Sequence, residues 1–172
     1  IGEFGRYVFA GHSEQRRFYG DTADRICERI KSALKESLIP IICIGEGEAQ
    51  YRRGETLSCI SMQIEQMRKG LKGEPKEVVI LYEPVWALGT GISPAAAYIN
   101  EIFAFIRNRT ETVWGAEWCE KARFVYAGSV TPHNAGEYMK QEKIDGLATG
   151  SGSLEAEKFA EIIEKAWEGF SI

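Results

Sequence analysis

The sequence predicts an α/β protein built on a parallel sheet. Apolar runs of strand length alternate five times with stretches whose apolar residues recur at helical spacing. Parallel neighbouring strands need a crossover connection, and an intervening helix supplies one. Two architectures satisfy this pattern, an open doubly wound sheet and part of an eight-stranded β/α barrel. Both collect their chemistry at the carboxyl ends of the strands.

Two strand–helix units are expected in the first 71 residues. The run "RYVFAG" (6–11) is the first strand, and the helical stretch 21–38 follows it. The run "IPIICIG" (39–45) is continuously apolar, as in a strand buried on both faces, and the helical stretch 55–71 comes next. Each helix presents one apolar stripe to the sheet. The stripes are formed by Ala23, Ile26, Cys27, Ile30, Ala33, Leu34 and Leu38, and by Leu57, Ile60, Ile64, Met67 and Leu71.

Three further units follow in the second part of the chain. Their strands are expected at 77–83 ("EVVILYE"), 122–128 ("ARFVYAG") and 144–150 ("IDGLATG"). Their helices are expected at 95–109, 133–140 and 155–167. The stretch 109–121 is expected to be a longer connection whose two tryptophans pack on the helical layer, with an interface role as the alternative.

Composition favours one globular domain over residues 1–172. The chain is 44% hydrophobic and 27% charged, and it contains no linker or low-complexity segment. The net charge of -4, with both signs mixed along the chain, gives no reason to expect nucleic acid or an anionic membrane surface as a partner. No apolar run approaches the roughly 18 residues of a membrane span, and the first residues lack a secretion signal. We therefore expect a soluble, cytoplasmic protein.

The four cysteines lack the spacing of a metal site or a redox pair. Cys27, Cys43, Cys59 and Cys119 lie far apart, with no CxxC and no Cys/His pattern. Because free cysteine is among the most buried residue types, we expect reduced, mostly buried thiols and no metal ion.

Polar residues follow two of the predicted strands at their carboxyl ends. "GHSEQRR" places His12, Ser13 and Glu14 after the first strand, and Glu83 closes the third. A carboxylate beside apolar Val85 can be partly desolvated and made more basic, so Glu83 is the candidate general base and His12 the candidate electrophile. Taken alone, Glu83 also fits a salt-bridged strand end, and His12 fits a structural histidine.

Glycine- and serine-rich turns follow the last two strands. "AGSV" and "TGSGSL" leave backbone N–H groups uncovered by bulky side chains, and a helix is expected to open at about Leu154, directly after the second turn. This arrangement suits a phosphate group, and it matches the usual phosphate position of a β/α barrel. Arg16 and Arg17 are most simply solvated or salt-bridging side chains.

Five stretches together resemble the triosephosphate isomerase family, in that family's order and over essentially the whole chain. They are "GHSEQRR", "IICIGE", "YEPVWALGTG", "YAGSV" and "IDGLATGSGSL". The resemblance implies a partial TIM (β/α)8 barrel of about five units and a cofactor-free exchange of dihydroxyacetone phosphate and glyceraldehyde 3-phosphate. It implies that Glu83 moves the proton between adjacent carbons and that His12 polarises the carbonyl. Ser13 and Glu14 resemble the polar support beside that pair.

The same resemblance assigns the phosphate contacts and a closing loop. Gly89 resembles the lid amide that closes on the phosphate, Ser129 a phosphate donor, and Gly150 with Ser151 the amides at the last turn. The segment Pro84 to Trp86 looks like the stiff hinge of that lid, which excludes water from the intermediate.

The chain departs from the family pattern in several places. Five βα units are expected where the family has eight, and the first-strand lysine and asparagine are not found, so catalysis by this chain alone is expected to be weak or absent. The lid's far end, "GISPAAA", is about two residues shorter, and Ala127 and Ser151 stand where the family usually has glycine. An isomerase of four-carbon ketose phosphates is therefore an alternative.

An arc of five strands leaves two open edges and uncovered apolar side chains. We expect a partner, either a second copy in a homodimer or a complementing N-terminal fragment. The competing interpretation is a catalytically silent, self-associating barrel fragment.

Overall fold

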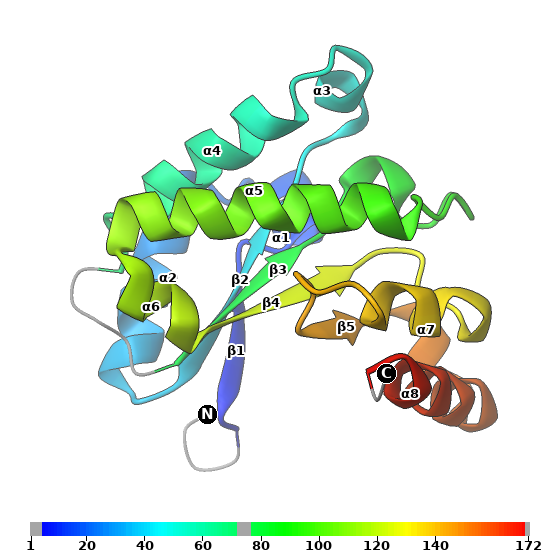
Figure 1. Ribbon diagram of the computed structural model, residues 1–172. Coiled ribbons are helices and arrows are strands. Elements are labelled where there is room, and N and C mark those ends of the chain that lie inside the picture. Colours follow the sequence, from blue (N-terminus) through cyan, green and yellow to red (C-terminus); the bar gives the residue numbers. More distant parts are fainter. Residues whose placement is uncertain (1–4, 72–76, 171–172) are drawn as a thin grey trace.

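The fold is a five-stranded parallel sheet with strand order β1-β2-β3-β4-β5 (Figure 1). The computed structural model describes residues 5–71 and 77–170. The strands are β1 (Tyr7–Ala10), β2 (Ile39–Ile44), β3 (Val78–Tyr82), β4 (Ala122–Ala127) and β5 (Gly146–Ala148). All five predicted strands are present; four are one or two residues shorter than expected, and β5 has three residues within the predicted 144–150. Sequential order without a reversal is that of a barrel segment rather than a doubly wound sheet, so the chain forms a partial TIM barrel.

Helices follow one another around one face of this sheet. The predicted helices correspond to α2 (Ala23–Lys35), α4 (Thr56–Met67), α5 (Ala96–Trp114), α7 (Pro132–Met139) and α8 (Ala156–Phe170). Figure 1 shows them in chain order around the sheet, and successive helices contact one another. Short elements that the sequence pattern did not predict lie between them: α1 (Ser13–Tyr19), α3 (Glu48–Arg52), α6 (Ala116–Lys121) and the 3₁₀ turns η1 (Val85–Ala87) and η2 (Ser151–Ser153).

The predicted connection over 109–121 is wrong, because most of it is helical. Helix α5 continues to Trp114, and α6 begins directly after Gly115, whose φ of 95° permits the break between the two helices. Trp114 and Trp118 stack with ring centroids 4.6 Å apart, and Trp118 is buried in the core. The expected packing of the tryptophans on the helical layer is therefore confirmed, although helices and not a loop carry them.

Strand register divides the core from an open face. Side chains at alternate positions, including Ile42, Ile80 and Phe124, are buried in one hydrophobic cluster with the helices. The other face is less covered, and on β1 the side chains of Tyr7 and Phe9 are 51% and 54% exposed. Parallel sheets are normally buried on both faces, so this face has the character of a barrel interior that five strands do not close.

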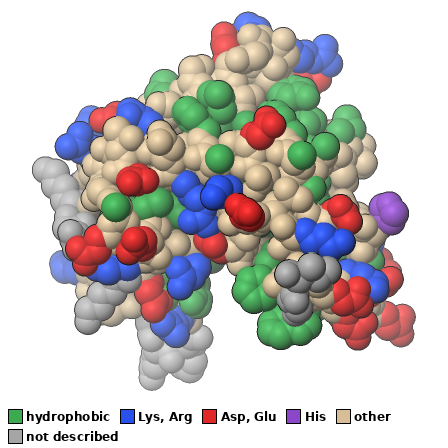
Figure 2. Space-filling view, in the orientation of Figure 1, with side chains coloured by type: hydrophobic (Ala, Val, Ile, Leu, Met, Phe, Trp, Pro, Cys, Tyr) green, Lys and Arg blue, Asp and Glu red, His purple; other side chains and the backbone are tan. Residues whose placement is uncertain are grey.

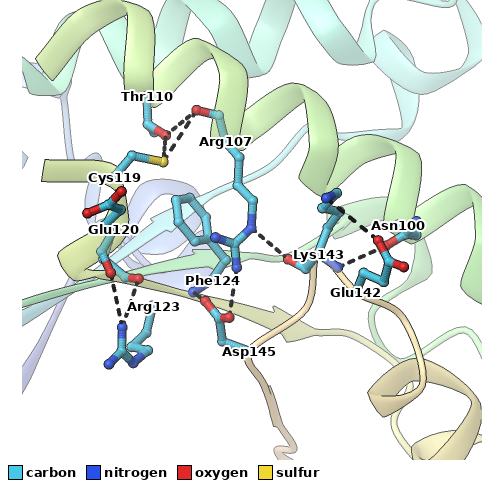
Figure 3. Close-up of polar contacts among 11 residues, drawn as sticks. Asn100, Arg107, Thr110, Cys119, Glu120, Arg123, Phe124, Glu142, Lys143 and Asp145 are labelled. Atoms are coloured by element: carbon cyan, nitrogen blue, oxygen red, sulfur yellow. Dashed lines mark hydrogen bonds and ion pairs between the residues drawn. The ribbon is translucent and has the colours of Figure 1, made fainter. Parts of the chain in front are cut away.

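Arg107 on α5 fixes the start of β5 against β4 (Figure 3). Its Nη2 lies 2.7 Å from Oδ1 of Asp145, its Nε donates to the carbonyl oxygen of Lys143 at 3.0 Å, and its guanidinium sits 4.1 Å from the Phe124 ring centroid. Asp145 Oδ2 in turn accepts a bond from the Phe124 amide at 2.7 Å. These contacts hold β5 in register, so the turns after β4 and β5 reach the same edge of the sheet.

The outer side of β5 borders an apolar groove. Its volume is about 690 Å³, and β5 and α8 form most of its lining. Figure 2 shows apolar side chains gathered over α8, and the exposed large apolar residues of this helix are Phe159, Ile163, Trp167 and Phe170.

All four cysteines are buried free thiols, as predicted. None of the helices in the described part of the chain has the length and apolar character needed to cross a bilayer.

Candidate active site

His12 and Glu83 meet at the carboxyl edge of the sheet. Glu83 directly follows β3, and His12 lies two residues beyond the end of β1. Because all five strands are parallel, both strand ends point to the same rim. The Nε2 atom of His12 lies 3.4 Å from Oε2 of Glu83. The structure thus joins the two residues that the sequence marked as an acid–base pair.

Glu83 is a buried carboxylate with local hydrogen-bond donors. It is 3% exposed, and its Oε1 accepts a 2.6 Å bond from the Ser13 amide. The Ser13 hydroxyl donates to Oε2 at 3.3 Å. Burial raises the pKa of Glu83 above its ordinary value, and His12 and the Ser13 bonds offset that rise in part. A raised pKa makes the carboxylate a stronger base than a solvent-exposed one.

The hydrogen bonding of His12 fixes its tautomer. His12 caps α1, and its Nδ1 accepts a 3.4 Å bond from the Glu14 amide. A nitrogen that accepts a hydrogen bond carries no proton, so in the neutral imidazole the proton lies on Nε2, which faces Glu83. The Glu14 side chain itself is exposed, and no described contact joins it to Glu83. The structure therefore brings His12, Ser13 and Glu83 together and leaves Glu14 at the surface.

Arg16 lies under this pair and is not the solvated side chain that the sequence suggested. Its Nε donates to the carbonyl oxygen of Gly11 at 2.7 Å, and its Nη2 donates to that of Cys43 at 3.0 Å. Burial lowers the pKa of the Arg16 guanidinium. The side chain ties the end of β1 to the end of β2, because those carbonyl groups follow or close these two strands. Arg16 therefore has a structural role at the site, which the sequence did not predict.

Glu46 is a buried polar centre that sequence reasoning missed. It follows β2 and is 0% exposed. Its Oε1 accepts bonds from Trp86 Nε1 at 2.8 Å and from the hydroxyls of Thr56 and Tyr82 at 3.2 Å each, and the Tyr82 hydroxyl is also 3.2 Å from Oε2. Burial raises the pKa of Glu46. The signal was its place just beyond a strand end in "IICIGE", two residues after β2, whereas Glu83 directly follows β3.

The loop after Glu83 has a fixed base and an open tip. Its base is the 3₁₀ turn η1, where the Val85 amide donates to Glu46 O at 3.0 Å. At the tip, Gly89 is exposed with a φ of 70°, and no atom lies within 4 Å of where its Cβ would stand. Glycine adopts this left-handed conformation without strain. The predicted lid is therefore anchored at Val85 to Ala87 and open to solvent at Gly89.

The turn after β4 contacts both ends of this loop. The Ser129 hydroxyl donates to Ala87 O at 3.0 Å, and the Ser93 hydroxyl donates to Ser129 O at 3.1 Å. Asn134 donates to Ser129 O at 2.8 Å and to the Ser93 hydroxyl at 3.0 Å. A serine hydroxyl has one proton to donate. In this conformation that of Ser129 is directed to the lid base.

Gly150 and Ser151 lie at the exposed turn after β5. Ser151 begins η2, and the long helix α8 begins at Ala156 and not at about Leu154 as predicted. A short 3₁₀ turn precedes this helix, and within it Ser153 Oγ donates to Gly150 O at 2.7 Å. These two residues share the carboxyl edge with Glu83, but no described contact links them to it. Among residues 5–71 and 77–170, no group of three or more histidine, cysteine or acidic side chains is placed to hold a metal ion.

The fold and this rim define a β/α-barrel protein with a buried carboxylate facing an imidazole. The family model for triosephosphate isomerase matches residues 3–166. Proteins named triosephosphate isomerase from Moorella thermoacetica and Dictyoglomus turgidum are each 41% identical, over 159 and 161 residues, and one from Picosynechococcus is 39% identical over 158. The chain belongs to the triosephosphate isomerase family.

The chain corresponds to part of the length of these relatives. The alignments cover 91–92% of this chain and 62–64% of the relatives, so the chain spans somewhat less than two thirds of their length.

Proposed function

We propose that this chain carries the proton-transfer pair of a triosephosphate isomerase, which interconverts dihydroxyacetone phosphate and glyceraldehyde 3-phosphate without a cofactor or metal. The observation that carries the proposal is the 3.4 Å approach of His12 Nε2 to Glu83 Oε2, with Glu83 3% exposed. An isolated carboxylate would not be buried at a strand end without cost. Its placement opposite the His12 imidazole supports acid–base work.

In this proposal Glu83 removes the proton from one substrate carbon and returns it to the neighbouring carbon. The raised pKa of Glu83 favours proton abstraction near neutral pH. His12 donates its Nε2 proton to the carbonyl oxygen on which negative charge develops, and then takes a proton from the hydroxyl oxygen of the neighbouring carbon, where the new carbonyl forms. Ser13 holds the resting carboxylate through its amide, and Glu14 is assigned to polar support at the start of α1.

The phosphate group is assigned to the turns beside this pair. Gly89 at the lid tip, Ser129 after β4, and Gly150 with Ser151 after β5 supply the proposed contacts. If the Ser129 hydroxyl is to donate to phosphate, its present bond to Ala87 must open, because only one proton is available. A phosphate group and the lid base therefore compete for the same Ser129 proton.

The 172-residue chain alone is proposed to turn over weakly or not at all. Its described strands form five parallel units, and stabilisation of developing charge in a barrel is shared around the whole rim.

We propose a cytoplasmic, glycolytic setting and one domain over 1–172. We also propose a partner that covers the open edges of the sheet, either a second copy or a complementing N-terminal fragment. The exposed Phe9 and Trp167 near the two edges favour the second candidate, a silent self-associating fragment. A four-carbon ketose phosphate remains the alternative substrate.

An isomerase assay on the purified chain tests the proposal. Activity should appear, or rise, when a polypeptide with three further βα units is added, and Glu83→Gln should lower it about 10² to 10⁴-fold, the usual contribution of a general base. Glu117→Gln is the matched control, because that carboxylate is exposed on α6 and its described contact is with Lys121, away from the pair. Equal turnover in wild type and Glu83→Gln would contradict the proposal, and a folded, complemented chain without turnover would favour the silent fragment.

A further inference from the structure

Trp86 in the lid base contacts a buried carboxylate through its indole N–H and an aromatic ring of another helix through its face. Trp86 in η1 donates its indole proton to Glu46, and its face stacks on Tyr51 of α3 with ring centroids 3.8 Å apart and an interplanar angle of 13°. Residues 51 and 86 belong to different βα units. The short helix α3, after β2, therefore reaches across to the loop after β3.

The stack on Trp86 is the main described side-chain contact of Tyr51. The residue is 40% exposed, lies outside the buried core cluster, and has no described side-chain hydrogen bond. Helix α3 is held by its backbone, since the Tyr51 amide donates to Gly47 O at 3.0 Å and the Glu55 amide donates to Gln50 O at 2.9 Å. An exposed aromatic ring that packs flat on one partner contributes mainly through that contact.

We propose that Tyr51 is a positioning residue that holds the lid in its resting conformation by stacking on Trp86. The proposal deepens the isomerase function above and rests on the lid role given there. In this proposal the open tip at Gly89 closes over a ligand by a turn of η1, which carries Trp86. Two rigid rings with centroids 3.8 Å apart lose their overlap when either one moves, so closure of the lid loses the stacking free energy of Tyr51 and Trp86.

The consequence is a defined bias in the lid equilibrium. A contact made in only one of two conformations shifts their populations by its own free energy. An aromatic pair typically changes such an equilibrium by about 2- to 10-fold. The hydrogen bond from Trp86 to Glu46 remains after the stack is removed, so η1 keeps this side-chain contact. Removing the stack should therefore raise the closed population of the ligand-free chain by that factor.

Hydrogen exchange in the ligand-free chain tests this directly. The Val85 amide, which donates to Glu46 O and so joins η1 to the segment after β2, should exchange about 2- to 10-fold faster in Tyr51→Ala. Tyr51→Phe keeps the ring and should match wild type. Arg52→Ala, on the same helix with an exposed ion pair to Glu48, is the matched control and should also match wild type. Far-UV circular dichroism checks that each variant is folded.

Titration with inorganic phosphate gives the second measurement. Apparent affinity scales with the fraction of closed molecules, so Tyr51→Ala should bind phosphate about 2- to 10-fold more tightly, and Tyr51→Phe should not. Unchanged exchange in Tyr51→Ala, or equal acceleration in Tyr51→Phe, would overturn the positioning role. Faster exchange in a chain that shows no turnover even when complemented would uphold Tyr51 while the isomerase function fails.

Discussion

Gly45 is the position where one added methyl group should damage both the fold and the site. It directly follows β2, and its amide and carbonyl bond the side-chain amide of Gln63 at 2.9 Å each. A Cβ at residue 45 would stand 1.8 Å from the carbonyl oxygen of Glu83. That oxygen belongs to the backbone of the candidate base, so no side-chain rotation can relieve the contact.

The size of the effect follows from the distance. Cβ atoms are essentially never found closer than 3.0 Å to such an atom, so Gly45→Ala must separate the ends of β2 and β3 by at least 3.0 - 1.8 = 1.2 Å. Overpacking of this kind costs about 1–3 kcal/mol of unfolding free energy, which lowers the Tm of a chain of this size by about 2–12 °C. Displacing a catalytic group by about 1 Å costs on the order of 100-fold in rate.

Thermal unfolding followed by circular dichroism, and the complemented isomerase assay, measure the two effects. Gly146→Ala is the control for stability, because Gly146 lies in strand β5 and a Cβ there would meet the Val125 side chain at 3.6 Å, an ordinary van der Waals contact. We expect a clearly lower Tm for Gly45→Ala and a nearly unchanged one for Gly146→Ala. A Tm within 1 °C of wild type for Gly45→Ala would refute the reasoning that the two strand ends are in rigid backbone contact.

Three further predictions concern the buried carboxylates and the open edges. Burial raises the pKa of Glu83 above its ordinary 4.5, so the contribution of this group to folding stability is greatest below pH 4.5 and is lost as pH rises through the folded pKa; Glu83→Gln should therefore raise Tm at pH 7 and leave it nearly unchanged at pH 4. Glu46→Ala should lower the unfolding free energy by about 3 kcal/mol in urea titrations, because it strands three buried donors, and a loss under 1 kcal/mol would contradict the hydrogen-bond network. Light scattering should show concentration-dependent association that Trp167→Glu weakens, and a monodisperse monomer would argue against an exposed interaction edge.

Much of the fold could be predicted because its signals are local. Continuous apolar runs such as "IPIICIG" and the helical stripe through Ile26 and Ile30 gave the strands and helices in their correct order. Short helices were missed because α1 and α3 are five to seven residues long and bury none of their residues, so they show no apolar period. The connection over 109–121 was misjudged because Gly115 interrupts an otherwise helical stretch.

The site was predictable to the extent that it depends on strand ends. His12 and Glu83 each stand at the end of an apolar run, and parallel strands must place such ends on one rim. Arg16, Glu46 and Tyr51 were not identified, because their partners are carbonyl groups and rings far away in the chain. No local pattern distinguishes a charged side chain that folds inward from one that stays in water.

The sequence by itself determined that this is a parallel β/α chain of the triosephosphate isomerase family with an imidazole and a carboxylate on its rim. The hydrophobic period and the polar residues at strand ends depend only on residues that are adjacent in the chain, so the sequence alone is enough to identify them. Only the tertiary structure decided that Glu83 is buried with its pKa raised, that Glu46 bonds Trp86 in the loop after β3, and that Tyr51 covers Trp86. Desolvation and stacking depend on which distant groups exclude water from one point, and that is settled only when the units pack together.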